Sequence, residues 1–236
     1  TGNLSLHAHN FTDRAQARRL ARELTACIEE QTGIAPFLSV DQEGGMVTRF
    51  SGDFTHFPGA MAVAAAGEPE NAYRVGLYTG RELLAVGLNA DFAPVVDIDY
   101  NFRNPITNVR TYGNDPDLVK AMGAAYLKGA KEEGVATAVK HFPGDGVDER
   151  DQHLLTSVNS LSCSEWDSTY GEIYKSLIQA GTLTIMAGHI AMPAYEEYFE
   201  KEPVKKLVPA TLSKNMLQKL LREKLGFEGL ICTDAT

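Results

Sequence analysis

The chain has 236 residues, of which 44% are hydrophobic and 22% are charged, as expected of a globular domain with a sizeable core. Its formal net charge is -9 and it has no block of Lys and Arg, which argues against a nucleic-acid partner and against an anionic membrane surface. A neutral or mildly polar substrate fits this charge better.

Strand-like and helix-like segments alternate along the chain. In chain order we expect a strand at 4–8, a helix at 13–30, a strand at 36–40, a helix at 70–86, a strand at 89–95, a helix at 116–133, a strand at 136–139, a helix at 165–180, a strand at 183–187, a helix at 213–225 and a strand at 230–233. Thr12 and Ser164 are the expected N-caps of the helices at 13–30 and 165–180.

Apolar strands separated by helices predict an α/β domain with a parallel sheet. A doubly wound sheet would satisfy this order, but no G-x-G-x-x-G follows the first strand. Polar residues follow nearly every strand, which favours a (β/α)8 TIM-type barrel. Because a closed barrel needs eight strands, we expect one that is truncated after about six. Residues 1–236 are therefore predicted to form one catalytic barrel, incomplete at one or both ends.

The three cysteines, Cys27, Cys163 and Cys232, lie far apart and lack metal-binding spacing, which indicates reduced thiols and a reducing compartment. The sequence has no apolar run long enough to cross a membrane and no secretory segment at its start. We expect a cytoplasmic protein on these grounds, although the chain opens at Thr1 as if its natural start lay upstream.

Residues 140–153 read K-H-F-P-G-D-G-V-D-E-R-D-Q-H and follow a buried strand. A loop at the carboxyl end of a buried strand is where α/β enzymes place their chemistry. Further titratable residues stand at or beyond the other strand ends: Asp41, Arg49, Asp97, Asp99, Arg110, His189 and Asp234. Such a set serves either acid/base hydrolysis or metal-assisted hydrolysis.

A metal site is the weaker of these two interpretations. His141, His153 and His189 are of the right type for zinc, but no H-E-x-x-H or similar local pair exists. Lys140 and Arg110 would also repel a cation. We expect no metal and no other cofactor.

Six motifs resemble those of glycoside hydrolase family 3. They are D-Q-E-G-G-M-V-T-R-F at 41–50, A-D-F-A-P-V-V-D at 90–97, N-V-R-T-Y-G at 108–113, K-H-F-P-G with a downstream D-x-H at 140–153, I-M-A-G-H-I at 185–190 and G-F-E-G-L-I-C-T-D-A at 226–235. They occur in the family's order and span nearly the whole chain. Within the family the chain most resembles bacterial β-N-acetylglucosaminidases, including those that act on peptidoglycan fragments.

The resemblance implies a retaining, two-step hydrolysis that releases terminal β-linked N-acetylglucosamine. Asp234 matches the nucleophile that forms a covalent glycosyl-enzyme. His153 matches an acid/base histidine on a mobile loop, with Asp151 as its dyad partner. An unperturbed imidazole titrates near 6.5, which suits this role. The other matches are substrate-binding positions: Asp41, Arg49, Arg110, Lys140, His141 and His189.

Each of these residues also has a structural alternative. Asp234 could cap a following helix. Asp41 could satisfy the backbone of the Gly44-Gly45 turn. Arg110 could join loops through nearby carboxylates such as Asp97.

Two positions depart from the family pattern. Asp145 stands where a second His is usual, and Gln152 stands where Ser is usual, so the loop geometry and the preferred aglycone stay open. Alternatives are a family 3 β-glucosidase or β-xylosidase, or a non-catalytic sugar-binding derivative. Because a histidine repels anionic acceptors less than a carboxylate does, phosphorolysis in place of hydrolysis is a further hypothesis. The sequence does not predict the oligomeric state, and it does not separate cell-wall recycling from chitin-oligosaccharide breakdown.

Overall fold

The computed structural model describes residues 2–50 and 54–235. Its centre is a parallel sheet whose strands lie in the order β1 (Leu4–Ser5), β2 (Leu38–Val40), β5 (Ala90–Asp91), β6 (Ala136–Phe142), β8 (Thr184–Ala187) and β10 (Leu230–Thr233). This spatial order is also the order along the chain. A doubly wound sheet would reverse direction at a switch point. The strands are therefore consecutive strands of a TIM-type barrel, and the predicted α/β fold class is confirmed.

The sheet is curled into a half-barrel. β1 and β10 form its two edges, yet Asn3 beside β1 and Ile231 of β10 line the same cavity of about 210 Å³. Thr137 of β6, in the middle of the sheet, lines it as well. The inner face therefore wraps around a common interior.

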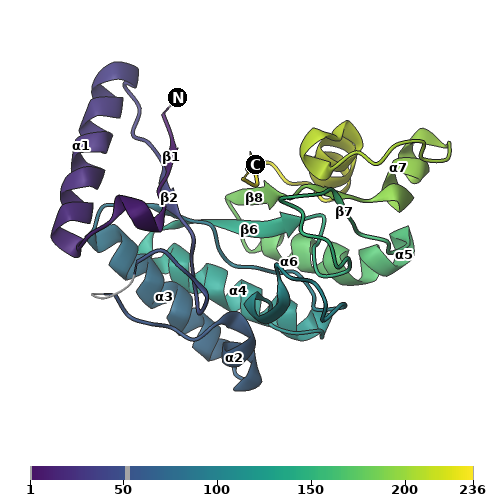
Figure 1. Ribbon diagram of the computed structural model, residues 1–236, viewed down its shortest axis with the longest axis horizontal. Helices are drawn as coiled ribbons and strands as arrows, with labels where there is room; N and C mark the ends of the chain where they lie inside the picture. The colour runs from purple at the N-terminus through teal and green to yellow at the C-terminus, as the bar shows by residue number, and fades with distance from the viewer. Residues whose placement is uncertain (1, 51–53, 236) are drawn as a thin grey trace.

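Helices cover the outer face of the sheet. They are α1 (Arg14–Thr32), α3 (Pro69–Ala85), α4 (Pro116–Glu133), α5 (Cys163–Trp166) with the π-helical turn η3 (Asp167–Gly171) and α6 (Glu172–Gln179), and the π-helical segment η5 (Asn215–Lys224). In Figure 1, α3, α4 and α6 lie side by side, with α4 packed against β6, and their buried apolar residues belong to the main core. Within the described residues, no helix combines the length and the apolar character needed to cross a membrane.

Both predicted N-caps were wrong. Asp13, not Thr12, caps α1, because its side chain accepts a hydrogen bond from a backbone N–H in the first turn. Ser162, not Ser164, caps α5. The Ser162 hydroxyl accepts from the Glu165 N–H, and the Glu165 carboxylate accepts from the Ser162 N–H. This reciprocal pair is a capping box, and the Glu three residues after a Ser is its sequence signal.

The elements that the sequence did not predict are short. They are the hairpin of β3 (Gln42–Gly44) and β4 (Val47–Thr48), α2 (Ala60–Ala65), the paired strands β7 (Ser157–Val158) and β9 (Ile190–Ala191), α7 (Pro193–Glu200), and the 3-10 turns η1 (Ala8–Asn10), η2 (Asn108–Arg110) and η4 (Ala210–Leu212). All of them follow the carboxyl end of a sheet strand. They therefore build the rim at which the polar residues gather.

Candidate active site

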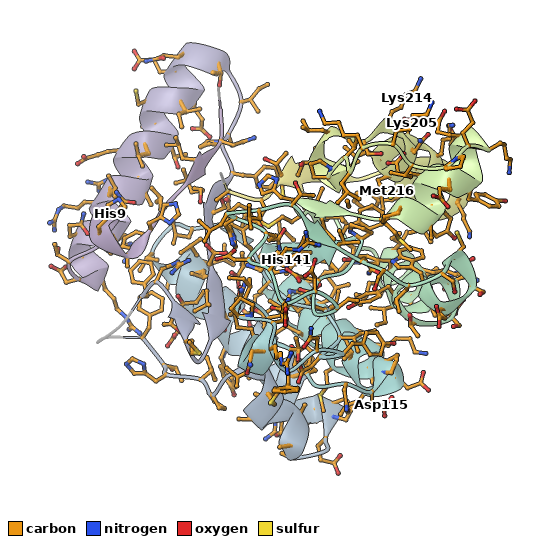
Figure 2. The ribbon with its side chains drawn as sticks, turned by 45° about the vertical axis from the view of Figure 1, so that its right-hand side comes forward. His9, Asp115, His141, Lys205, Lys214 and Met216 are labelled. Carbon is orange, nitrogen blue, oxygen red and sulfur yellow. The ribbon has the colours of Figure 1, made fainter. Side chains whose placement is uncertain are left out.

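The carboxyl ends of the strands bring the predicted site residues to one rim. Asp41 follows β2, Lys140 and His141 lie near the end of β6, His189 follows β8 and Asp234 follows β10. Figure 2 shows His141 in the middle of the molecule, where the end of β6 meets its neighbours. The rim carries two rows of charged groups, one around Asp234 and one around Lys140.

Asp234 lies between two imidazoles. Its Oδ2 is 3.8 Å from His141 Nε2, and its Oδ1 is 3.7 Å from His153 Nε2. A carboxylate holds each ring from behind: Asp97 Oδ2 is 2.6 Å from His141 Nδ1, and Asp151 Oδ1 is 2.8 Å from His153 Nδ1. A carboxylate at Nδ1 fixes the orientation of the ring and turns Nε2 toward the reacting group. The structure thus brings the predicted nucleophile and dyad together.

The two oxygens of Asp234 differ. Oδ1 accepts a hydrogen bond of 2.8 Å from the Ala235 N–H. Oδ2 is buried and has no hydrogen-bond partner among the residues that the structure describes. Burial alone would raise the pKa of the Asp234 carboxyl, but the imidazoles of His153 and His141 hold it well below its ordinary value. The carboxylate is therefore ionised and keeps one unbonded oxygen, as a nucleophile requires.

His153 is poised as a proton donor. The Asp234 carboxylate, together with that of Asp151, outweighs partial burial and raises the pKa of His153 to about 9. The ring is therefore protonated at neutral pH. Its side chain is 36% exposed, so that a group arriving from solvent can reach it.

The second row of charges is centred on Lys140. Its Nζ is 2.8 Å from Asp41 Oδ1 and 2.6 Å from Glu43 Oε1, although the side chain is only 2% exposed. Arg49 contacts Asp41 at 3.3 Å. Arg110 holds Glu43 through two hydrogen bonds of 2.7 and 2.8 Å. Positive and negative groups alternate along this row, and the buried ammonium is neutralised on both sides, as a buried charge requires.

The sequence analysis did not identify Glu43. Burial would raise the pKa of its carboxyl, but Lys140 and Arg110 lower it to about 2. The available signal was the spacing to Asp41, because residues two apart on an extended segment point to the same face. The Arg110 guanidinium joins η2 to the β3–β4 hairpin by bonding the Glu43 carboxylate. The structural alternative predicted from the sequence names Asp97 as the partner of Arg110 in place of Glu43.

Both ring nitrogens of His189 have partners. Nδ1 is 3.1 Å from Thr211 Oγ1, and Nε2 is 2.9 Å from the carbonyl oxygen of Ala235. The ring therefore ties the end of β8 to the residue directly after Asp234. These contacts favour support of the nucleophile segment, and direct substrate contact by His189 stays a prediction.

The rim carboxylates pair with nitrogen cations and imidazoles. Across residues 2–50 and 54–235, no three or more His, Cys, Asp and Glu side chains form a group that could hold a metal ion. A separate apolar cavity of about 360 Å³ adjoins Glu43 and Arg110. Met46, Met61 and Tyr112 line it, whereas the groups around Asp234 do not, so this cavity is not where the acid and base groups meet.

Comparison with known proteins decides the family. All of residues 1–236 match the model described as the glycosyl hydrolase family 3 N terminal domain. The chain belongs to glycoside hydrolase family 3. The resemblance inferred from the six motifs is thereby confirmed.

Three proteins illustrate the similarity. A Cellulomonas fimi protein named beta-N-acetylglucosaminidase/beta-glucosidase is 46% identical over 232 residues, which are 98% of this chain and 41% of the relative. The structure of a family 3 beta-N-acetylglucosaminidase from Paenibacillus sp. str. FPU-7 matches 100% of this chain and 43% of its own, with 37% identity and a TM-score of 0.93. A structure named beta-glucoside phosphorylase BglX matches 93% of this chain and 40% of its own, with 42% identity and a TM-score of 0.87. The chain thus spans less than half the length of these relatives.

The raised pKa of His153 gives a prediction. In Asp234→Asn, loss of the carboxylate removes both its hydrogen-bonding interaction with His153, which is the main cause of the raised pKa, and its charge. We expect the pKa of His153 to fall from about 9 toward the ordinary value of 6.5 in an NMR titration of the imidazole. Because the pKa of His153 is higher in the folded state than in the unfolded state, protonation of the ring stabilises the fold. This contribution to the free energy of unfolding is complete below about pH 6.5 and is lost as the pH rises through about 9. Glu149→Gln, on the same loop, is the control. An unchanged titration in Asp234→Asn would contradict the pairing.

Proposed function

We propose that this chain carries the catalytic centre of a retaining β-N-acetylglucosaminidase, which releases terminal β-linked N-acetylglucosamine. The main support is the buried Oδ2 of Asp234, which has no hydrogen-bond partner within residues 2–50 and 54–235, and the position of the carboxylate opposite the protonated His153. The sugar is taken from the names of the Cellulomonas and Paenibacillus relatives.

In the first step, Asp234 Oδ2 attacks the anomeric carbon and forms a covalent ester with the sugar. The bond between that carbon and the glycosidic oxygen breaks. The leaving oxygen takes the proton from His153 Nε2, and the ring becomes neutral while Asp151 continues to hold Nδ1. The carboxylate at Nδ1 keeps the ring in the orientation that this transfer needs.

Esterification then changes the role of His153. The hydrogen-bonding interaction with the Asp234 carboxylate is the largest cause of the raised pKa of His153, and it disappears when that carboxylate becomes an ester. The pKa of the ring therefore falls, and the neutral imidazole accepts a proton from water. The water oxygen attacks the anomeric carbon, the ester bond breaks, and Asp234 leaves as a carboxylate with the sugar configuration retained.

The substrate must separate His153 from Asp234. Their 3.7 Å contact is shorter than the separation of about 5–5.5 Å that retaining carboxylate pairs keep around a glycosidic bond. Leu154 and Leu155, directly after His153, are 79% and 63% exposed and do not anchor the loop to the core. Binding of the sugar therefore breaks the ion pair between His153 and Asp234 by a small outward shift of the His153 ring.

The row around Lys140 is suited to holding the sugar. Asp41 and Arg49 keep 17% and 33% of their side-chain surface exposed beside the buried Lys140. A site that hydrogen-bonds hydroxyls through fixed charges rejects analogues that lack them, because its own polar groups are then left unpaired. We assign hydroxyl recognition to Asp41, Lys140 and Arg49, with Glu43 and Arg110 as their support.

The role of His153 as acid predicts a dependence on the leaving group. His153→Ala should reduce kcat/KM by about 10²- to 10⁴-fold for alkyl N-acetylglucosaminides, whose leaving groups need a proton. Dinitrophenyl N-acetylglucosaminide, whose leaving group needs none, should lose far less. The ratio of the two rates is the measurement. An equal loss on both substrates would show that His153 is not the acid.

Turnover of β-glucosides and transfer to phosphate form a second candidate function, favoured by the names of two relatives, which include beta-glucosidase and beta-glucoside phosphorylase. Phosphate would replace water in the second step and give a sugar 1-phosphate. We expect nitrophenyl N-acetylglucosaminide to be cleaved faster than nitrophenyl glucoside. Product analysis with and without inorganic phosphate decides between acceptors, and absence of sugar 1-phosphate in phosphate buffer would exclude the phosphorylase alternative.

A further inference from the structure

Gln152 points in the opposite direction from its two catalytic neighbours. It stands between Asp151 and His153, whose side chains are 27% and 36% exposed, whereas Gln152 is only 2% exposed. The mechanism proposed above gives this buried amide no task. A buried amide must nevertheless satisfy its donors and its acceptor.

Both ends of the Gln152 amide are bonded to different parts of the rim. Its Nε2 donates to Asp145 Oδ2 at 2.9 Å, and its Oε1 accepts from the His189 N–H at 2.7 Å. Asp145 belongs to the loop after β6, and His189 follows β8. One side chain therefore ties the segment that carries the dyad to two strand ends.

Asp145 is itself held in place. Its Oδ1 accepts from Asn104 Nδ2 and from the Gly146 N–H, both at 2.7 Å. Its own N–H donates to Asp97 Oδ1 at 2.7 Å. At Gly146, where φ is +92°, a Cβ would lie 2.1 Å from the carbonyl oxygen of Ile98, so the chain runs close against its neighbour there. Asp97 also orients His141. Asp97 therefore contacts the His141 ring directly and, through Asp145 and Gln152, the segment that carries His153.

The polarity of these contacts admits only one orientation of the amide. An ionised Asp145 offers acceptors only, and the His189 N–H offers a donor only. The amide of Gln152 must therefore turn its NH2 to Asp145 and its oxygen to His189. If the amide were reversed, both of its contacts would join like groups.

We propose that Gln152 and Asp145 are positioning residues, which hold the loop at 151–153 so that Nε2 of His153 faces Asp234. Their catalytic consequence rests on the proposed function, but the geometric claim does not.

The test exchanges the two groups. Gln152→Glu sets two carboxylates against each other, and Asp145→Asn sets two NH2 groups against each other. The double variant Asp145→Asn/Gln152→Glu restores a donor and an acceptor. In it, the amide introduced at position 145 would keep its oxygen toward Asn104 and Gly146 and turn its NH2 to the new carboxylate, which still accepts from His189. Glu149→Gln, whose surface ion pair with Arg103 lies on the same loop, is the matched control.

We expect each single variant to lose about 10- to 100-fold in kcat/KM on an alkyl N-acetylglucosaminide, because an unmatched buried polar pair displaces the acid. The loss on the dinitrophenyl substrate should stay within about threefold, and the double variant should return to within about threefold of the wild type on both. In NMR titrations the pKa of His153 should fall from about 9 in Gln152→Met, which removes the contacts and changes no charge, and should stay near 9 in the double variant, which conserves the net charge.

Either of two results would overturn the proposal: a Gln152→Met variant whose His153 titration matches the wild type, or single variants that lose both substrates equally. If Gln152→Glu does not fold, Gln152→Met removes the contacts without adding charge and gives the same comparison. The NMR titration needs no turnover. A protein that cleaves no glucosaminide would therefore refute the proposed function and still leave the positioning claim decided by the His153 titration.

Discussion

The carboxylate of Asp234 between two imidazoles, each held by a second carboxylate, is the arrangement on which the rest of the site depends. Asp97 comes after β5, His141 from β6, Asp151 and His153 from the loop after β6, and Asp234 from the end of β10. Only a parallel sheet with strands in chain order, curled so that its ends converge, places these groups in one row. The fold therefore supplies the position of each group, and the contact between them keeps Asp234 ionised and the His153 imidazole protonated.

The two rows of charges at the rim solve one physical problem in different ways. A buried ion is tolerated only when neighbouring charges and hydrogen bonds replace its hydration. In the row around Lys140, the carboxylate oxygens of Asp41 and Glu43 face the cations of Lys140 and Arg110. These pairs give a rigid surface for sugar hydroxyls. Around Asp234 the compensation is incomplete, because Oδ2 has no partner within the described residues and the imidazoles stand 3.7 and 3.8 Å away. This difference separates a binding surface from a group that can form a new bond.

Much of the fold was predictable because it depends on local patterns. The helix at 116–133 and the strand at 230–233 have the predicted bounds, and the polar residues after the strands meet at one rim as expected. The wrong N-cap predictions and the missed site residues depend on which side chains meet in space. The choice of Ser162 over Ser164 as a cap needed the partner at position 165. The roles of Glu43 and Gln152 were missed, because their partners lie on other elements and the sequence does not say which buried polar groups face each other. The short rim elements were missed because they have too few residues for a periodic pattern.

The central claim is that Asp234 Oδ2 forms the bond to the sugar, and covalent trapping tests it most directly. A 5-fluoro N-acetylglucosaminyl fluoride has a good leaving group, and its ring fluorine slows the breakdown of the glycosyl-enzyme. Peptide mass spectrometry after brief incubation should show one fluorosugar added per chain, on the peptide that contains Asp234, with no adduct in Asp234→Asn. An adduct on another carboxylate, or an adduct that persists in Asp234→Asn, would contradict the account.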